Sequence, residues 1–344
     1  MKKNLFLISV VALALGACSN DSTIEQNTAT ELQPAEIAFS PLTQNMTRAA
    51  VDGTTFTPTT MKVTAYDATT PANYFGATTF TKDASTWKGG KYWPFAPVTI
   101  NFLAIANANA DNETGVTWGP TISSVGSNPT EKVQIVMGDN KTNQYDLMYA
   151  CGTGTVTQTG SPANTLNFPS NVPMEFKHAQ AWVKFTVKAG DAATASALTV
   201  NSITLNSVSC QGTYLVTHAN WNETKASRDA AGDGSKDGSV SGAWSDYSTY
   251  ADDIAAVKDA GYSTLSTSVQ DFASLMVVPN QGIASFTINY SFGGNTYNYT
   301  YTPASTALAQ ATKYTYNITL TLHEIEIAAT VDDWDEGGPT AVSL

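Results

Sequence analysis

Residues 314–322, YTYNITLTL, decide the fold class of this chain, because apolar and polar side chains alternate along them without a break. Tyr316, Ile318 and Leu320 face one way, and the Asn and Thr residues between them face the other. Alternation with a period of two is typical of a half-buried β-strand. Residues 325–331, IEIAATV, repeat the pattern, so the end of the chain is predicted to form neighbouring strands.

Upstream segments extend the same prediction. Residues 286–290 and 297–301 alternate on either side of Gly293-Gly294-Asn295, which is the signal of a tight hairpin turn. Further strands are expected at residues 35–40, 61–66, 99–106, 133–137, 146–150 and 183–188. Residues 152–173, rich in Thr, Gly, Ser and Pro, are expected to be a loop, and residues 252–259 are the one expected helix.

Composition agrees with an all-β chain. Charged residues make up 13% of the 344 residues, about half the usual share of roughly 25%. Thr supplies 49 residues, and its branched side chain packs well on a pleated sheet. The formal net charge of −12 and the absence of a Lys/Arg cluster argue against a nucleic-acid partner.

The first eighteen residues indicate export. Two lysines precede an apolar run at residues 5–14, which is shorter than the roughly 20 residues needed to span a bilayer and so predicts a signal peptide. The run ends in Leu15-Gly16-Ala17-Cys18, which resembles the lipobox of bacterial lipoproteins and predicts lipidation of Cys18. The alternative is an ordinary signal peptide with an incidental cysteine.

The chain length suits two domains, each large enough for its own core. Strands that follow one another without helices predict antiparallel sheets, and hence two tandem β-sandwiches. The predicted organisation is a signal peptide at 1–17, a flexible polar tether at 18–34, an amino-terminal sandwich at 35–170 and a carboxyl-terminal sandwich at 171–344.

The sequence contains no motif that predicts a catalytic site. The three histidines, His178, His218 and His323, stand in no metal-ligand or nucleophile spacing, and His178 is expected to make a structural hydrogen bond. Cys151 and Cys210 are either a disulfide or two semi-buried thiols. Acidic residues 233–238 and 332–336 are interpreted as solvated loop charge in preference to calcium ligands. No enzyme, cofactor or metal site is predicted.

Nine segments, taken in order, resemble the fimbrillins, which are type V pilin subunits and related lipoproteins of gram-negative gut and oral bacteria. They are the lipobox at Cys18 and residues 37–40 (IAFS), 47–49 (TRA), 92–94 (YWP), 146–150 (DLMYA), 174–179 (MEFKHA), 275–280 (LMVVPN), 314–320 (YTYNITL) and 330–334 (TVDDW). The resemblance implies two transthyretin-like sandwich domains, in agreement with the alternation.

The resemblance also implies assembly. Fimbrillin precursors are lipidated, carried to the outer membrane and cut after an arginine by an arginine-specific protease, which removes the first strand. A strand of another fimbrillin subunit then fills the open groove by β-strand addition. Here the cut would fall between Arg48 and Ala49 and remove residues 35–48, with Ile37 and Phe39. The alternative for Arg48 is a solvated loop arginine.

The carboxyl end is the expected donor strand, through Ala341, Val342 and Leu344. Gly337-Gly338-Pro339 interrupts the alternation, which leaves room for an anchor, accessory or tip subunit, or for a frayed terminus. The alternative function is a monomeric surface lipoprotein or tip adhesin. It would bind glycan or host protein through some of the seven Trp and 15 Tyr residues.

Overall fold

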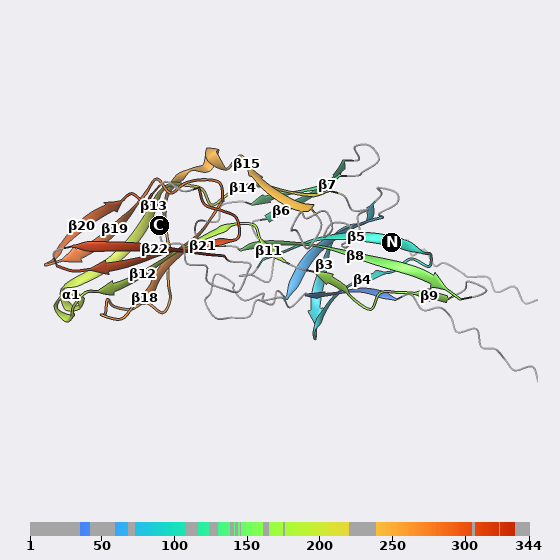
Figure 1. Cartoon of the computed structure of the whole chain (residues 1–344), viewed down its shortest axis with the longest axis horizontal. Helices are drawn as coiled ribbons and strands as arrows, with labels where there is room; N and C mark the ends of the chain where they lie inside the picture. The colour runs from blue at the N-terminus through green and yellow to red at the C-terminus, as the bar shows by residue number, and fades with distance from the viewer. Residues whose placement is uncertain are drawn as a thin grey trace, which may run out of the picture. The chain divides into compact units, whose positions relative to one another are not determined.

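The computed structural model describes residues 35–41, 59–67, 73–107, 116–123, 130–137, 141, 144, 146–160, 165–174, 176–219, 239–304, 307–322 and 324–333 (Figure 1). In these residues the chain is almost entirely β-structure. Helical turns are limited there to α1 (Ala192–Ala197) and a 3₁₀ turn at Tyr247–Tyr250. The all-β prediction is confirmed.

The first sheet has nine strands. In spatial order they are β10 (Val172–Met174), β1 (Glu36–Pro41), β4 (Thr86–Tyr92), β3 (Asn73–Asp83), β2 (Thr60–Asp67), β5 (Val98–Asn107), β8 (Leu147–Thr159) and β11 (Lys177–His178), and β9 (Thr165–Asn167) pairs with β8. Apolar side chains from β1, β2, β3, β4, β5, β8 and β10 meet in one cluster. Phe102 of β5 lies in it with no exposed surface.

One expectation for this sheet is wrong. Residues 152–173 were expected to be a loop, but β8 runs on to Thr159, and β9 and β10 follow. The glycines that suggested a loop are strand positions where other groups approach closely. A Cβ added at Gly154 would lie 2.3 Å from the Trp93 ring, and one at Gly152 would lie 2.8 Å from Val172 Cγ1. Glycine inside a strand often marks such a close approach.

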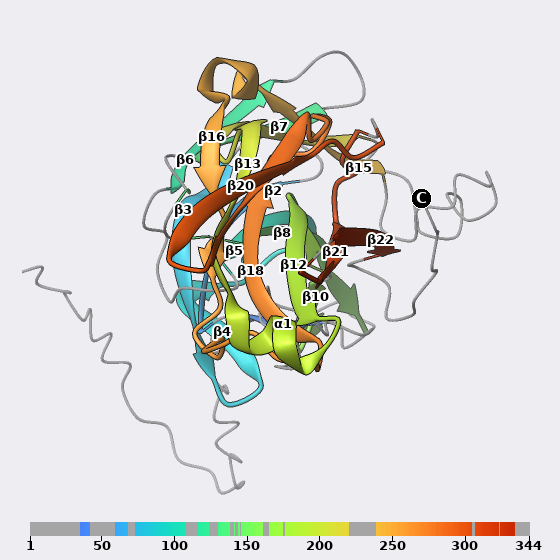
Figure 2. The same cartoon turned by 90° about the vertical axis from the view of Figure 1, so that its left-hand side faces the viewer.

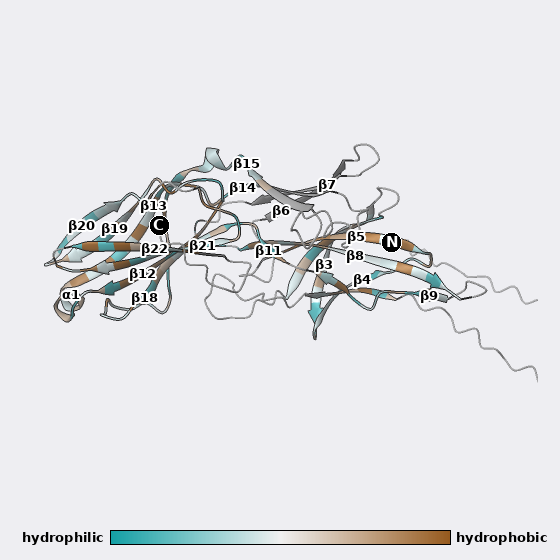
Figure 3. Ribbon diagram, in the orientation of Figure 1, coloured by the Kyte–Doolittle hydropathy of each residue, from teal (hydrophilic) through white to brown (hydrophobic). Residues whose placement is uncertain are grey.

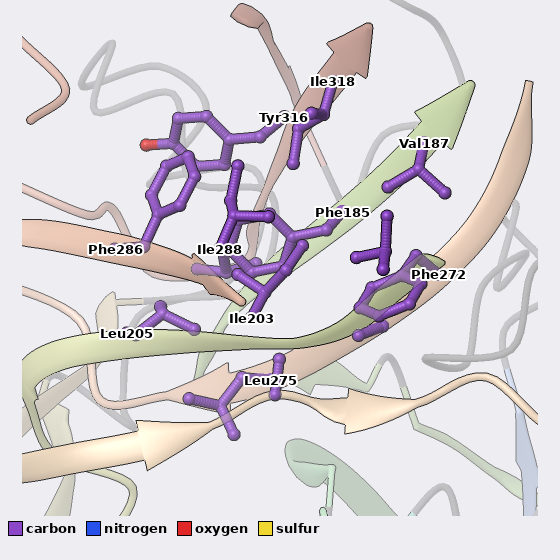
Figure 4. Packing of buried hydrophobic residues seen from close by; sticks show 14 of the residues in the cluster. Phe185, Val187, Ile203, Leu205, Phe272, Leu275, Phe286, Ile288, Tyr316 and Ile318 are labelled. Carbon is purple, nitrogen blue, oxygen red and sulfur yellow. The ribbon is translucent and has the colours of Figure 1, made fainter. Parts of the chain in front are cut away.

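Two further sheets enclose a second core. One has the order β17 (Val257–Lys258), β18 (Gln270–Val277), β12 (Ala181–Ala189), β21 (Thr312–Leu320) and β22 (Ile325–Asp333), and the other has the order β16 (Asp252–Ala255), β13 (Leu198–Val208), β19 (Ser285–Phe292) and β20 (Asn295–Tyr301). Phe185, Phe286 and Tyr316 pack ring against ring between them (Figure 4). Burial, with the neighbouring Tyr301 and Tyr314, raises the pKa of Tyr316 to about 12.

The predicted alternation is visible as interleaved hydropathy along these strands (Figure 3). In β21 the apolar residues Tyr314, Tyr316, Ile318 and Leu320 are buried, and the Thr and Asn residues between them are half-buried. In β22 Ile325, Ile327, Ala329 and Val331 are half-buried. The hairpin prediction is also confirmed, since β19 and β20 are joined through Gly293 and Gly294 at φ of 58° and 80°. These backbone angles are costly for any residue with a side chain, which explains the two glycines.

The fourth sheet has the order β15 (Ser239–Ser245), β14 (Gly212–Ala219), β7 (Thr130–Met137) and β6 (Val116–Ser123), all antiparallel. Among the described strands, two pairs differ from the predicted antiparallel arrangement: β1 runs parallel to β10, and β12 runs parallel to β21. Both pairs join strands that are distant in sequence, as parallel pairing requires. Figure 2 shows the chain from the side of α1.

The prediction of a helix at residues 252–259 is wrong. That segment forms β16 and β17, because Ile254 and Ala256 alternate into the core while Asp253 and Ala255 are exposed. The α-helix is α1, where the Asp191 carboxylate accepts a hydrogen bond of 2.7 Å from the Thr194 backbone N–H. Such a cap satisfies one of the free N–H groups of a helix start.

Candidate functional site: the interior strand β1

The first strand of the described residues, β1, lies inside its sheet. β1 pairs with β10 in parallel on one side and with β4 in antiparallel fashion on the other. Phe39 is therefore opposite both Val172 and Trp87. Removing β1 would leave two rows of backbone groups without partners, one on each neighbour, and such rows are templates for another strand.

The side chains of β1 are central to the first core. Ile37 and Phe39 have no exposed surface. The Phe39 ring makes edge-to-face contacts with Phe80 at 4.9 Å and with Phe102 at 5.0 Å between ring centroids. Aromatic pairs in this geometry are stabilised beyond the area that they bury. The two residues predicted for the removable strand are thus placed in the core as expected.

The start of β1 is held by further hydrogen bonds. The Trp93 backbone N–H donates to the Ala35 carbonyl at 2.9 Å, and the Gly90 N–H donates to the Glu36 carboxylate at 3.0 Å. In the neighbouring β3–β4 hairpin, a hydrogen bond and the charge of Lys88 hold the pKa of the exposed Asp83 carboxyl below its usual range. The six-residue strand pairs with β4 from Glu36 to Phe39, with an irregularity between Glu36 and Ala38, and with β10 from Phe39 to Pro41.

The other predicted site residues lie outside the described residues. They are the lipidation site Cys18, the processing pair Arg48 and Ala49, and the donor-tail residues Ala341, Val342 and Leu344. In the sequence, Arg48 stands between the end of β1 at Pro41 and the start of β2 at Thr60. A cut there separates β1 from the rest of the chain without severing any described strand.

A buried polar cluster holds the segment after β10. Nδ1 of His178 lies 2.8 Å from Oδ1 of Asp146, and both side chains are almost fully buried. The Gln180 side chain accepts from the Leu147 N–H at 2.9 Å, and the Trp244 indole donates to the Ala179 carbonyl at 2.6 Å. The structural hydrogen bond expected for His178 is confirmed.

Sequence reasoning missed the centre of this cluster. The Gln310 amide donates to the hydroxyls of Tyr149 and Tyr214 and to the His178 carbonyl, at 2.8–3.1 Å. Gln310 precedes β21 and belongs to no pattern in the sequence. A lone glutamine gives no signal of its partners, because they are up to 161 residues away.

Cys151 and Cys210 are thiols, the first half-buried and the second in the second core. In the described part of the chain, no group of three or more His, Cys, Asp or Glu side chains is arranged to hold a metal ion. Of the acidic segments considered for calcium, residues 233–238 lie outside the described residues. No described helix is both long and apolar enough to cross a membrane.

These observations define an all-β protein whose first strand is an interior member of its sheet. The family model of the fimbrillin-like proteins matches residues 47–334, which is most of the chain. The protein belongs to the fimbrillin-like family. This is a family of fimbrial proteins, not of enzymes.

Solved structures are similar to this chain at low sequence identity. A fimbrial protein from Bacteroides vulgatus is 16% identical, with a TM-score of 0.45, over 87% of this chain and 99% of that one. The fimbrial anchor protein Mfa2 from Porphyromonas gingivalis is 10% identical, with a TM-score of 0.37, over 88% and 98%. The tip fimbrial protein Mfa3 from the same organism is 12% identical, with a TM-score of 0.42, over 88% and 100%. A search of curated proteins finds no match.

Proposed function

We propose that this protein is a subunit of a surface fimbria that polymerises by exchange of β1 for a strand of another subunit. The observation that carries the proposal is the interior place of β1, which is bonded to β4 and β10 and buries Ile37 and Phe39. Family membership supports the fimbrial role, and the free edges left by β1 give the physical route to assembly.

In this proposal the chain is exported as a lipoprotein through Cys18 and anchored in the outer membrane by its lipid. It folds into two tandem sandwiches, and an arginine-specific protease then cuts after Arg48. The departing strand removes two large apolar side chains, each worth roughly 1.5–3 kcal/mol when buried. The empty groove therefore favours any strand that restores that burial together with the backbone hydrogen bonds.

The donor must meet the geometry of the groove. A strand that replaces β1 has to run parallel to β10 and antiparallel to β4, and it has to present apolar side chains at the positions of Ile37 and Phe39. Two apolar residues separated by one other residue satisfy this spacing. Val342 and Leu344 have it, and we propose them as the donor pair.

Arg48→Ala is expected to abolish polymerisation while the precursor stays folded, because β1 then keeps its place between β4 and β10. Fibre yield on cell surfaces and the amino-terminal residue of the mature protein are the measurements. Arg48→Lys is the matched control for charge, and it should also remain uncut by an arginine-specific protease. Fibres whose subunits begin at Ala49 in the Arg48→Ala strain would contradict the proposal.

Val342→Asp should leave the melting temperature of the precursor within about 1 °C of the parent and reduce fibre yield at least tenfold. The reason is that a donor with a charge at this position would place it in an apolar groove, where an unpaired charge is costly. Ser343→Asp, one residue along, is the control that should polymerise normally. Equal fibre yields from both variants would show that the tail is not the donor strand and would favour an anchor or tip role.

A further inference from the structure

We propose that a cleft between the β19–β20 and β21–β22 hairpins binds a neutral oligosaccharide by stacking sugar rings on tyrosine. This site is separate from the groove of β1, and its function does not depend on polymerisation. The cleft has a volume of about 490 Å³, which lies in the usual range of small-ligand sites. Its lining includes Tyr290, Phe292, Tyr297, Tyr299, Leu322 and Glu324.

The cleft exists because both sheets of the second sandwich end at this side. β20 is the last strand of one sheet, and β22 is the last strand of the other. Tyr297 and Tyr299 are opposite Tyr290 and Ile288 in the register, so they share the face of the sheet that carries the core. Ile288 is fully buried, but Tyr297 and Tyr299 keep 43% and 36% of their surface exposed.

Exposed apolar surface concentrates in this one place. In the described residues, ten large hydrophobic side chains are exposed, and four of them line the cleft: Phe292, Tyr297, Tyr299 and Leu322. Single exposed apolar residues are ordinary, whereas a cluster around a hollow indicates a binding surface.

The tyrosine rings that line the cleft are held in place without a ligand. The Tyr290 and Tyr297 rings are stacked, with centroids 5.7 Å apart and an angle of 25° between their planes. Across the cleft, the Thr321 hydroxyl accepts from the Glu324 N–H at 2.8 Å and lies 3.0 Å from the Glu324 carbonyl oxygen, which fixes the turn of the second hairpin. Preorganised groups cost less entropy on binding than mobile ones.

The chemistry of the lining selects the ligand class. Tyrosine faces suit the C–H faces of a sugar ring, and tyrosine hydroxyls with the Glu324 carboxylate suit its hydroxyl groups. Glu324 is the one charged side chain among the described lining residues, and the net charge of the chain is −12. An anionic glycan would therefore be repelled, and a neutral sugar is favoured. A peptide strand would instead pair with the free backbone edge of β20, for which an aromatic hollow is unnecessary.

The test is ligand-observed NMR on the purified precursor with maltohexaose, xylohexaose and N-acetyllactosamine as neutral probes. 3′-Sialyllactose is the anionic probe, and a peptide of residues 334–344 is the strand probe. We expect saturable binding of at least one neutral sugar. We expect Tyr297→Ala to weaken it at least tenfold, in line with the loss of a central aromatic anchor. Tyr297→Phe, which keeps the ring, should stay within about threefold of the parent.

Tyr250→Ala is the matched control, because Tyr250 is equally exposed at 43% but does not line the cleft. It should bind sugar like the parent. Glu324→Lys gives a second, independent variant, which should weaken neutral sugars and admit 3′-sialyllactose. The proposal fails if no neutral probe binds, if the sialylated probe or the peptide binds the parent in their place, or if Tyr297→Ala binds like the parent.

Discussion

Phe39→Asp is expected to destabilise the precursor by at least about 4 kcal/mol. The change removes a fully buried ring that contacts Phe80 and Phe102, and burial of such a side chain is worth roughly 1.5–3 kcal/mol. It also puts a carboxylate among apolar groups, where an unpaired charge costs more than that gain. Since domains are stable by only about 5–15 kcal/mol, the amino-terminal sheet should lose most of its stability.

The measurement is urea unfolding of the precursor, followed by circular dichroism. Ser40→Asp is the matched control, because Ser40 is the next residue along β1, on the opposite face and half-buried. It should cost less than about 1 kcal/mol. After cleavage behind Arg48, the trimmed subunits from the Phe39→Asp and parent precursors have the same sequence, and a remaining difference in their stability would show that β1 had not left.

His178→Ala is expected to destabilise the chain by about 3–5 kcal/mol. The imidazole is the partner, at 2.8 Å, of the Asp146 carboxylate, which has no exposed surface. Removing the imidazole leaves the buried Oδ1 of Asp146 without its hydrogen-bond partner, and an unsatisfied buried polar group is costly. Unlike Phe39→Asp, this variant should weaken the precursor and the trimmed subunit equally, since neither residue belongs to β1.

Two further variants distinguish the loss of the Asp146–His178 interaction from a loss of side-chain packing. Lys177→Ala, at the half-buried neighbouring position in β11, should cost less than about 1 kcal/mol. The double variant Asp146→Leu/His178→Leu should recover part of the loss, because apolar groups of similar size often replace a buried pair at little cost. A double variant that is less stable than His178→Ala alone would contradict this account of the pair.

Strand positions were predictable where the signal was local. Alternation over residues 314–322 and 325–331 gave β21 and β22, and the glycines at 293 and 294 gave the hairpin of β19 and β20. The two errors have a common cause. Gly152 and Gly154 indicated a loop, but they are glycines because other parts of the chain approach them. Residues 252–259 look helical until their pairing with β13 and β18 is known.

The candidate site was predictable only in part. The apolar spacing of Ile37 and Phe39 was evident in the sequence, and so was their burial. Their position between β4 and β10 was not, because Phe39 meets Val172 from 133 residues away (172 minus 39). The contacts of Gln310 and the aromatic cleft were likewise unpredictable, since each brings together segments that share no local pattern.

By itself, therefore, the sequence determined the class of fold, most of the strand-forming segments and the resemblance to a family. These properties depend on periodicity, composition and short motifs, which act over a few neighbouring residues. The tertiary structure alone decided that β1 is an interior strand, that His178 and Asp146 meet in a buried pair, and that tyrosines gather beside the edge strands β20 and β22. The reason is that strand order and side-chain clustering depend on which distant segments pair, and a free backbone edge can pair with many sequences.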